Sequence, residues 1–383
     1  MIRIDRRRLL DPALPAAIVQ RRRRALDLAE AALAAVEPEA ATARVLVGRQ
    51  GLRGCTVLAF GKAAIPMARA AIECCAPRAG IVVAPEVEAL EPLRVVRGAH
   101  PLPARDAHVV GRQVLELARS QGPDEVVLCL VSGGGSALLE LPADGVTIDQ
   151  IRARTDALMK AGAPIEELNA ARIGWSQLKG GKLARALLPA RVVNVILSDV
   201  PGQPLSVVAS GPTVLDDPRI ESVAAANNQT AVQGVLSAAA DAGIFLEPAG
   251  RLGGEARLMG QRLMQEAAGS FALDPWIDGF VAGGETTVTV RGAGRGGRNG
   301  ELVLGAAPAL YEHLVLSLAT DGVDGSSRSA GALLDGSVLE AAPGPIDAAL
   351  ADNDSARWLE AAGGLLQTGP TGTNVADVAI VLR

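Results

Sequence analysis

The sequence is poor in aromatic residues, which make up 2% of its 383 residues: four phenylalanines, three tryptophans and one tyrosine. Surfaces that bind bases or sugar rings by stacking need aromatic side chains, so this shortage argues against them. Hydrophobic residues still reach 49%, so large cores can be built from alanine, leucine, valine and isoleucine. The chain is longer than one ordinary core requires, which predicts two domains.

Metal-binding patterns of thiols and imidazoles are also lacking. The four cysteines, Cys55, Cys74, Cys75 and Cys129, do not have the paired spacing of a zinc site, and the three histidines are far apart in the sequence. Cys55 and Cys129 lie within apolar runs. We therefore expect reduced thiols in a protein core and a cytoplasmic location.

Neither a basic field nor a membrane-spanning run is present. The net charge is −5, and acidic and basic residues are mixed along the chain, which argues against nucleic acid as a partner. No apolar run reaches about 18 residues, which argues against a membrane partner. Arginines at 6–8 and 21–24 predict a solvated first helix, with a membrane-surface or nucleic-acid arm as the weaker alternative. We expect a small-molecule substrate and, as the candidate assembly, a homodimer.

The stretch from Val126 to Leu139 organises the rest of the chain. The unbroken apolar run 126–131 is typical of a strand buried on both faces. Three glycines follow, Gly133 to Gly135, flanked by Ser132 and Ser136. A strand, a glycine loop and a helix start would form an anion site, because backbone N–H groups and the helix dipole favour negative charge. A plain tight turn in an α/β domain explains this one loop equally well.

Other apolar runs also end in polar or glycine-bearing corners. The sequence predicts strands at 55–60, 80–84, 192–197 and 314–319, two strands within 279–290 and a last strand at 378–382, with a helical stretch at 221–242. In open α/β sheets ligands bind beyond the carboxyl ends of the strands. The corners lie at Gly61-Lys62, Ser132–Ser136, Ser198-Asp199, Gly283–Glu285 and Thr320–Asp324. They therefore predict one site shared by two domains, residues 1–246 and residues 247–383.

These corners contain the groups that phosphoryl transfer requires, namely an anion cradle, cations and carboxylates. Lys62 and Arg298 are the cations that we predict to stabilise the transferred phosphoryl group, with a solvated side chain as the alternative for each. Asp199 and Asp321 are candidates for binding Mg²⁺ or orienting the attacking hydroxyl; the alternative is helix capping or turn formation. A dinucleotide fingerprint and a Walker motif are both absent. His100, which precedes a proline, is interpreted as structural.

With these residues in place, the sequence resembles the class II glycerate 2-kinases, whose C-terminal domain is called MOFRL. The resemblance covers nearly the whole chain. It is carried by FGKAA at 60–64, HPLP at 100–103, SGGGSALL at 132–139, LKGGKLA at 178–184, LSDV at 197–200, ASGPT at 209–213, GGETTVTV at 283–290, GRGGRN at 294–299, TDGVDG at 320–325 and TGPTGTNVAD at 368–377.

The resemblance implies an α/β fold with a Rossmann-like large N-terminal domain, a smaller α/β C-terminal domain and an active site in the cleft between them. It implies transfer of phosphate from ATP, with Mg²⁺, to the 2-hydroxyl of D-glycerate, giving 2-phosphoglycerate and ADP. The implied catalytic residues are Lys62, Arg298 and Asp199. The predicted substrate- and phosphate-binding residues are Ser132, Gly133, Gly134, Gly135, Ser136, Arg172, Lys179, Ser210, Gly211 and Asn299, and the predicted metal-binding residues are Asp321, Glu285 and Asp324.

The sequence departs from the family pattern at several polar positions. ARIGWS at 171–176 has Gly174 and Trp175 where a histidine and its neighbour are usual. Gln203 and Ser206 replace two aspartates, and Gly300 replaces a glutamine. The glycines that shape the backbone remain, so these departures concern the substrate and catalytic competence rather than the fold.

Three alternatives to ordinary glycerate kinase activity remain open at this point. The lost polar groups would redirect selection toward a larger or differently branched hydroxy acid, with its carboxylate held by Arg172. The protein could instead be a non-catalytic sensor of a phosphorylated metabolite. A hydroxypyruvate reductase is a third alternative, but it would need a nicotinamide site, for which the sequence has no proper fingerprint.

Overall fold

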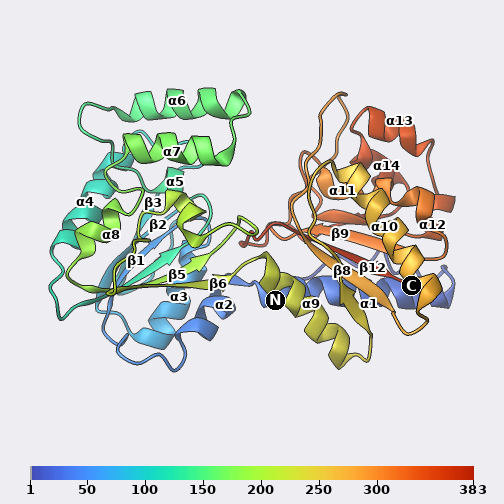
Figure 1. Ribbon diagram of the computed structural model, residues 1–383, viewed down its shortest axis with the longest axis horizontal. Coiled ribbons are helices and arrows are strands. Elements are labelled where there is room, and N and C mark those ends of the chain that lie inside the picture. Colours follow the sequence, from blue (N-terminus) through green and yellow to red (C-terminus); the bar gives the residue numbers. More distant parts are fainter. Residues whose placement is uncertain (1) are drawn as a thin grey trace. The chain divides into compact units, whose positions relative to one another are not determined.

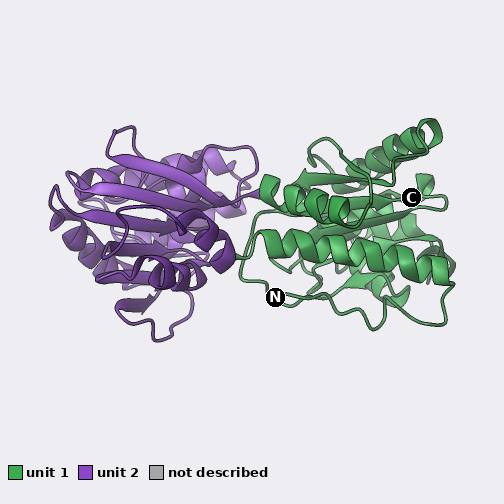
Figure 2. Cartoon of the chain, turned by 90° about the horizontal axis from the view of Figure 1, so that it is seen from below, with its two compact units in different colours: residues 1–37, 228–383 green, residues 38–227 purple. Residues whose placement is uncertain are grey.

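The computed structural model describes residues 2–383, which form two compact units, coloured separately in Figure 2. Unit 2 consists of residues 38–227, whereas unit 1 combines residues 1–37 with residues 228–383. This division differs from the predicted boundary after residue 246. Helix α1 (Ala16–Ala35) and helix α9 (Asn228–Asp241) pack against each other, and both belong to unit 1.

Unit 2 is built on a six-stranded sheet in which every strand runs parallel to its neighbours. The strand order, β3-β2-β1-β4-β5-β6, is the Rossmann order, which confirms the predicted class of the N-terminal part. The strands are β1 (Thr56–Phe60), β2 (Ala79–Ala84), β3 (Leu93–Arg97), β4 (Val126–Val131), β5 (Arg191–Leu197) and β6 (Ile220–Ala226).

Helices cover both faces of this sheet (Figure 1). One core packs side chains of β1, β4 and β5 against two of the helices, α4 and α8. The helices of unit 2 are α2 (Pro38–Leu46), α3 (Ala64–Cys75), α4 (Ala107–Arg119), α5 (Gly135–Leu138), α6 (Ile148–Lys160), α7 (Ile165–Trp175) and α8 (Lys182–Leu187), with a 3₁₀ helix at Leu205–Ser210. Because both faces are covered, β4 is apolar at every position, as the sequence predicted.

Strand β6 corrects the predicted helical stretch 221–242. The alanines of this segment favour a helix, but residues 220–226 pair with β5 at the edge of the sheet. The helix begins only at Asn228. Pairing with a neighbouring strand has overridden the local helix propensity.

Unit 1 contains a second six-stranded sheet, of mixed direction, in the order β11-β10-β9-β12-β8-β7. Its pairs are antiparallel except β7 with β8. The strands are β7 (Leu246–Pro248), β8 (Gly279–Gly284), β9 (Leu314–Ala319), β10 (Gly331–Leu334), β11 (Leu365–Leu366) and β12 (Asp377–Leu382).

The remaining helices of unit 1 surround this sheet (Figure 1). They are α10 (Ala256–Leu273), α11 (Arg298–Gly305), α12 (Gly336–Glu340), α13 (Ile346–Ala351) and α14 (Ser355–Ala361), with a 3₁₀ turn at Ala307–Ala309. Helix α1 contacts α9, β9 and β12, so an N-terminal helix packs against the sheet that contains the C-terminal strand β12. Its buried side chains include Leu26, Leu28 and Leu33.

The second strand predicted within 279–290 is wrong. Strand β8 ends at Gly284, and Thr287 forms only an isolated bridge with Glu255. The side chain of Glu255 accepts hydrogen bonds from the backbone and the hydroxyl of Thr289. Side-chain contacts therefore hold a segment whose alternating pattern predicted a strand.

Two further observations concern membranes and thiols. Among residues 2–383, no helix combines the length and the apolar character needed to cross a membrane. The four cysteines are free thiols; Cys55, Cys75 and Cys129 are buried, and Cys74 is exposed.

Candidate active site

The candidate site of unit 2 lies where the strand order changes direction, between β1 and β4. The loops that follow these strands carry Lys62 and the run Ser132–Ser136. The backbone N–H of Lys62 donates to the carbonyl of Gly133 at 2.9 Å, and that of Ala63 donates to Ser132 Oγ at 3.0 Å. Ligands of open α/β sheets bind at this switch point. The structure therefore joins two of the predicted corners.

Glycine is required at the centre of this loop for two physical reasons. Gly134 has φ of 80°, a conformation that L side chains rarely adopt. A Cβ atom on Gly134 would lie 3.1 Å from both His100 Cδ2 and Lys62 Cγ. A Cβ on Gly133 would lie 2.1 Å from Asp199 Oδ2. The bare backbone thus lets the side chains of His100, Lys62 and Asp199 approach the loop.

A cavity of about 310 Å³ opens beside the loop. Its polar lining consists of His100, Gly134, Ser136, Asn169, Arg172 and Asp199. Its apolar lining consists of Pro101, Ala137, Met159, Ile165, Val200, Val207, Val208 and Ala209. Helices α6 and α7, which lie side by side in Figure 1, contribute Met159, Ile165, Asn169 and Arg172 to this lining.

The charges around the cavity suit an anionic ligand. Burial lowers the pKa of Arg172, and the carboxylate of Glu140 opposes this effect. Burial, then Lys62 and Arg172, lowers the pKa of His100 to about 4. The imidazole is therefore neutral at pH 7, and the guanidinium of Arg172 is charged, as arginine is throughout this range.

Lys179, a predicted substrate-binding residue, is instead buried and paired. Its side chain is 1% exposed, as is that of Glu140, and its ammonium group forms an ion pair with the Glu140 carboxylate. It also lies 3.4 Å from the carbonyl oxygen of Leu139. Burial lowers the pKa of Lys179, and Glu140 opposes this effect. Lys179 does not line the cavity and holds the segment after α5 in place.

Several predicted loop residues have internal partners rather than exposed surfaces. Ser132 is 1% exposed and accepts the N–H of Ala63. Ser210 is equally buried, donates to Asn169 Oδ1 at 2.8 Å and lies 2.9 Å from Ser136 Oγ. Among the predicted binding residues, those that line the cavity are Gly134, Ser136 and Arg172. The predicted residues behind them are Ser132, Gly133, Gly135, Ser210 and Gly211.

A second group of predicted residues lies in unit 1, where strands β8 and β9 end and the neighbouring strand β12 begins. Arg298, at the start of α11, binds Asp377 through two bonds, Nε to Oδ2 at 2.5 Å and Nη2 to Oδ1 at 2.9 Å. Its Nη1 lies 2.9 Å from Glu285 Oε1. Burial lowers the pKa of Arg298, but its bond to Asp377 and the surrounding carboxylates outweigh burial and raise it overall. Asp377 is 1% exposed, and burial raises its pKa to about 6 although Arg298 opposes this effect.

The three carboxylates predicted to bind metal are not gathered around one point. Asp324 is buried and accepts the N–H groups of Asn299 and Gly300, each at 2.9 Å. Glu285 is paired with Arg298, and Asp321 Oδ1 accepts the N–H of Val323 at 3.0 Å. Within residues 2–383, no three histidine, cysteine or carboxylate side chains are placed to hold a metal ion. The side chain of Asn299 also has internal partners, since it accepts a hydrogen bond from the Ser317 hydroxyl and donates one to the Asp324 carboxylate.

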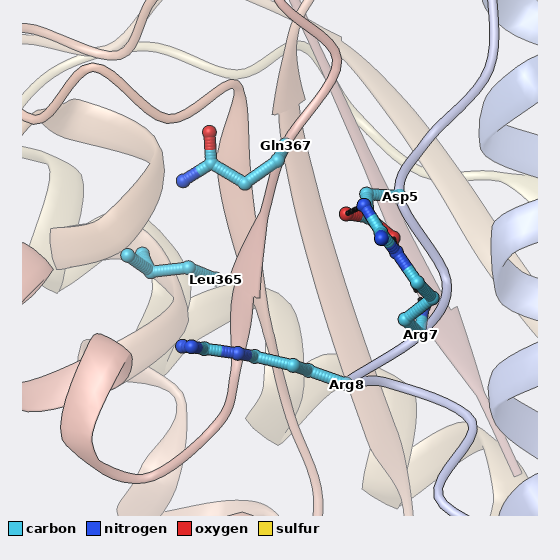
Figure 3. Close-up of a pocket in the computed structure, with 5 residues that line it drawn as sticks. All are labelled: Asp5, Arg7, Arg8, Leu365 and Gln367. Atoms are coloured by element: carbon cyan, nitrogen blue, oxygen red, sulfur yellow. Dashed lines mark hydrogen bonds and ion pairs between the residues drawn. The ribbon is translucent and has the colours of Figure 1, made fainter.

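A separate pocket of about 460 Å³ in unit 1 contains none of the predicted site residues. Its lining consists of Asp5, Arg7, Arg8, Leu365 and Gln367. Figure 3 shows Arg7 beside Asp5, with which it forms an ion pair at 2.9 Å, and Arg8 extending toward Leu365. The chain is held here by the N–H of Asp5, which donates to the carbonyl of Gln367. Two of the N-terminal arginines thus belong to a surface pocket on the second sheet.

Sequence reasoning missed three residues of these sites. His100 was interpreted as structural, yet it lines the cavity; its place in the HPLP motif was the available signal. Asn169 gave no signal, because one asparagine in a helix is unremarkable in sequence. Asp377 ends a matched motif and begins a strand, a position at which a buried carboxylate needs a partner.

Comparisons with known proteins identify the family of the chain. Residues 24–242 match a domain of unknown function, DUF4147, and residues 279–377 match the MOFRL family. A D-glycerate 2-kinase of Thermotoga maritima is 36% identical, and the alignment covers 94% of this chain and 97% of the relative. A protein of Agrobacterium vitis with the provisional name hydroxypyruvate reductase is 35% identical, with 92% of each chain covered.

A solved structure shares the fold over nearly the same length. The crystal structure of a glycerate kinase from Thermotoga maritima superposes with a TM-score of 0.86 at 34% identity, covering 94% of this chain and 98% of that one. Two family regions in the same chain, and identity extending over almost its full length, lead to one conclusion. The chain belongs to the DUF4147/MOFRL glycerate kinase family.

Proposed function

We propose that this protein is an ATP-dependent glycerate 2-kinase, which phosphorylates the 2-hydroxyl of D-glycerate to give 2-phosphoglycerate and ADP. The observation that carries the proposal is the cavity of unit 2 at the switch point of the sheet, which Arg172, Asp199 and the glycine loop line together. Support comes from the D-glycerate 2-kinase of Thermotoga maritima, which is 36% identical to this chain over nearly its full length.

The roles proposed for individual residues follow from charge and exposure. Arg172 binds the carboxylate of the acid, because a guanidinium offers two parallel donors to a carboxylate. The glycine loop and Ser136 bind phosphate oxygens. Lys62 and Arg298 stabilise the negative charge of the transferred phosphoryl group, as cations do in other kinases. Asp199 orients the acceptor hydroxyl.

The carboxylates of unit 1 do not fit a metal cage made by the protein alone. Asp324 is committed to backbone donors and Glu285 to Arg298. Mg²⁺ commonly keeps several waters and binds one or two carboxylates together with nucleotide phosphates. We therefore propose Asp321 as the carboxylate that meets a nucleotide-bound Mg²⁺, and we assign no step of the reaction to the metal.

The decisive experiment is an ADP-release assay with Mg²⁺-ATP and a panel of hydroxy acids that includes D-glycerate. We expect D-glycerate to be turned over faster than every other acid. ADP release with none of the acids would overturn the proposal. If calorimetry then showed binding of a phosphorylated acid, the sensor function would stand instead. Oxidation of NADH with hydroxypyruvate would support a reductase.

The same assay tests the two cations. We expect Lys62→Ala and Arg298→Ala each to lower kcat about 100- to 1,000-fold, because each removes charge stabilisation from the transition state. If both act on the same phosphoryl group, the double variant should lose less than the product of the single losses. Lys160→Ala and Arg357→Ala, at exposed residues, are matched controls. Full turnover in either cation variant would contradict these roles.

A larger hydroxy acid is the second candidate substrate. The apolar lining from Met159 and Ile165 favours it, because these side chains could contact a longer carbon chain. Two of the sequence departures give it less support. Gly174 and Trp175 are not part of the cavity lining, and Trp175 instead lies under the guanidinium of Arg154. The acid panel decides between the two substrates by their relative kcat/KM.

A further inference from the structure

We propose that His100 accepts the proton of the acceptor hydroxyl during phosphoryl transfer. This inference rests on the proposed kinase function and goes beyond it by naming the base. The residue lies in the loop that follows β3, in a stretch interpreted from the sequence as structural.

His100 lies beside the glycine loop that is proposed to bind phosphate. Its side chain lines the same cavity as Gly134, Ser136, Arg172 and Asp199. Gly134 lies between His100 and Lys62, since a Cβ atom on that glycine would lie 3.1 Å from a side-chain atom of each. An acid held by Arg172 and the glycine loop would therefore have its hydroxyl within the part of the cavity that His100 borders.

The charges around His100 also favour a base at this position. The groups that surround the imidazole are Lys62 from the loop after β1, Arg172 from α7 and Asp199 from the segment after β5. Burial and the two cations lower the pKa of His100 to about 4, so a ring nitrogen is available as an acceptor at neutral pH. This basicity resembles that of an aspartate, the residue that accepts the hydroxyl proton in protein kinases.

A neutral base suits this cavity better than a charged one. The acid brings a carboxylate and the nucleotide brings a triphosphate, so a carboxylate base would repel both. Asp199 is the rival base, and its Oδ2 would lie 2.1 Å from a Cβ placed on Gly133. Both side chains line the cavity and both lie against the glycine loop, Asp199 at Gly133 and His100 at Gly134. The neutral imidazole of His100 therefore favours it as the base, and Asp199 keeps the role of orienting the hydroxyl.

The acceptor oxygen forms a bond to the γ-phosphorus of ATP, and the bond from that phosphorus to the β,γ-bridging oxygen breaks. ADP leaves with the electron pair of that bond. The hydroxyl proton moves to the neutral nitrogen of His100, which later releases it to water.

Kinetics of His100→Asn and His100→Gln test the proposal. We expect kcat to fall about 100-fold or more while KM for D-glycerate changes less than about threefold, because base catalysis contributes in this range. The residual kcat should rise steadily with pH, since hydroxide replaces the lost base. His108→Asn, on α4 and outside the cavity, is the matched control and should keep the wild-type kcat. A loss confined to KM, or a kcat within threefold of wild type in folded variants, would overturn the proposal.

Proton NMR of the imidazoles provides an independent test, because the chain has only three histidines. Loss of one Cε1–H signal in His100→Asn assigns the resonance. We expect that signal to move little between pH 8 and pH 5 and to shift when D-glycerate is added. A signal that does not shift at D-glycerate concentrations that saturate turnover would overturn the proposal, because His100 would then lie away from the bound acid. If the wild-type enzyme consumed no ATP, the proposed kinase function would fail separately, whatever the midpoint of His100.

Discussion

At Asp377, burial and ion pairing act in opposite directions on one carboxyl group. Burial raises its pKa to about 6 although Arg298 lowers it. The folded protein therefore binds this proton more readily than the unfolded chain, whose aspartates have a pKa near 3.8. The contribution of Asp377 to the free energy of unfolding is thus largest at low pH and declines as pH rises from about 4 to about 6.

We expect Asp377→Asn to remove this decline. The difference in unfolding free energy, wild type minus variant, should fall by up to about 3 kcal/mol between pH 4 and pH 6, following a shift of about two pKa units. Urea unfolding at a series of pH values measures it. A difference that stays constant over this range, or grows with pH, would show that Asp377 does not titrate there.

The same pair affects how kinetic data on Arg298 are read. Removing the guanidinium leaves a buried carboxylate with one fewer partner, a change that commonly costs about 3–5 kcal/mol. Circular dichroism of Arg298→Ala should therefore accompany its kcat, so that loss of folded protein is not mistaken for loss of catalysis.

At the scale of elements, the loop after β4 depends on glycine for two separable reasons. Gly134 combines a positive φ with close contacts to His100 and Lys62, whereas Gly145 has a similar φ of 78° and no atom within 4 Å of an added Cβ. We expect Gly134→Ala and Gly145→Ala each to lose about 1 kcal/mol of stability, the cost of left-handed backbone.

Catalytic activity should separate these two variants. Gly134→Ala should lose at least about tenfold in kcat, because its methyl group displaces side chains of the cavity, and a misplacement of about 1 Å can cost about 100-fold. Gly145→Ala should retain wild-type kcat. Equal activities in an ADP-release assay would show that the contacts of Gly134 are dispensable.

Elements that are buried on both faces were predictable from sequence. β4 and β9 have the predicted ends, because an unbroken apolar run leaves few alternatives. The start of α6 also depends on a local sequence pattern, since Thr147 forms a full capping box with Gln150. The predictions failed where distant partners decide. Alanine-rich β6 is a strand only because β5 lies beside it, and Lys179 is internal only because Glu140 is buried with it.

The glycine loop shows the same division within the site. Sequence identified the loop as an anion cradle, and the structure places Gly134 and Ser136 at the cavity. Which of the five loop residues face the cavity depends on packing against Phe60, Asp199 and Ala209. These contacts join segments that are far apart in the chain, so local sequence patterns do not predict them.

At the scale of the whole molecule, the sequence of one unit is inserted into the sequence of the other. Residues 38–227 are continuous, whereas the second unit needs residues 1–37 together with residues 228–383. We expect a fragment 38–227 to fold alone, with cooperative thermal unfolding and shifts of the His100 signal on adding D-glycerate. It should show no kinase activity, since it lacks Arg298.

The second unit provides the matched comparison. A fragment 247–383, cut at the boundary that the sequence predicted, lacks α1, α9 and the first residue of β7, and should aggregate or remain unfolded. Residues 1–37 joined by a flexible linker to residues 228–383 should fold. Gel filtration and circular dichroism distinguish these outcomes, and cooperative folding of 247–383 alone would contradict the discontinuous unit.

The discontinuity has a consequence for synthesis on the ribosome. Helix α1 is synthesised well before β12, a strand of the second sheet against which it packs. At about 5–20 residues per second, roughly 350 residues separate the two by about 20–70 s. Residues 38–227, which form the parallel sheet, and then α9, which packs against α1, are synthesised within that interval. Leu26, Leu28 and Leu33 of α1 are therefore made long before its native surroundings are complete. The nascent chain therefore carries a helix whose apolar face is incompletely covered until β12 appears, which makes that helix a target for chaperones that hold unfolded segments.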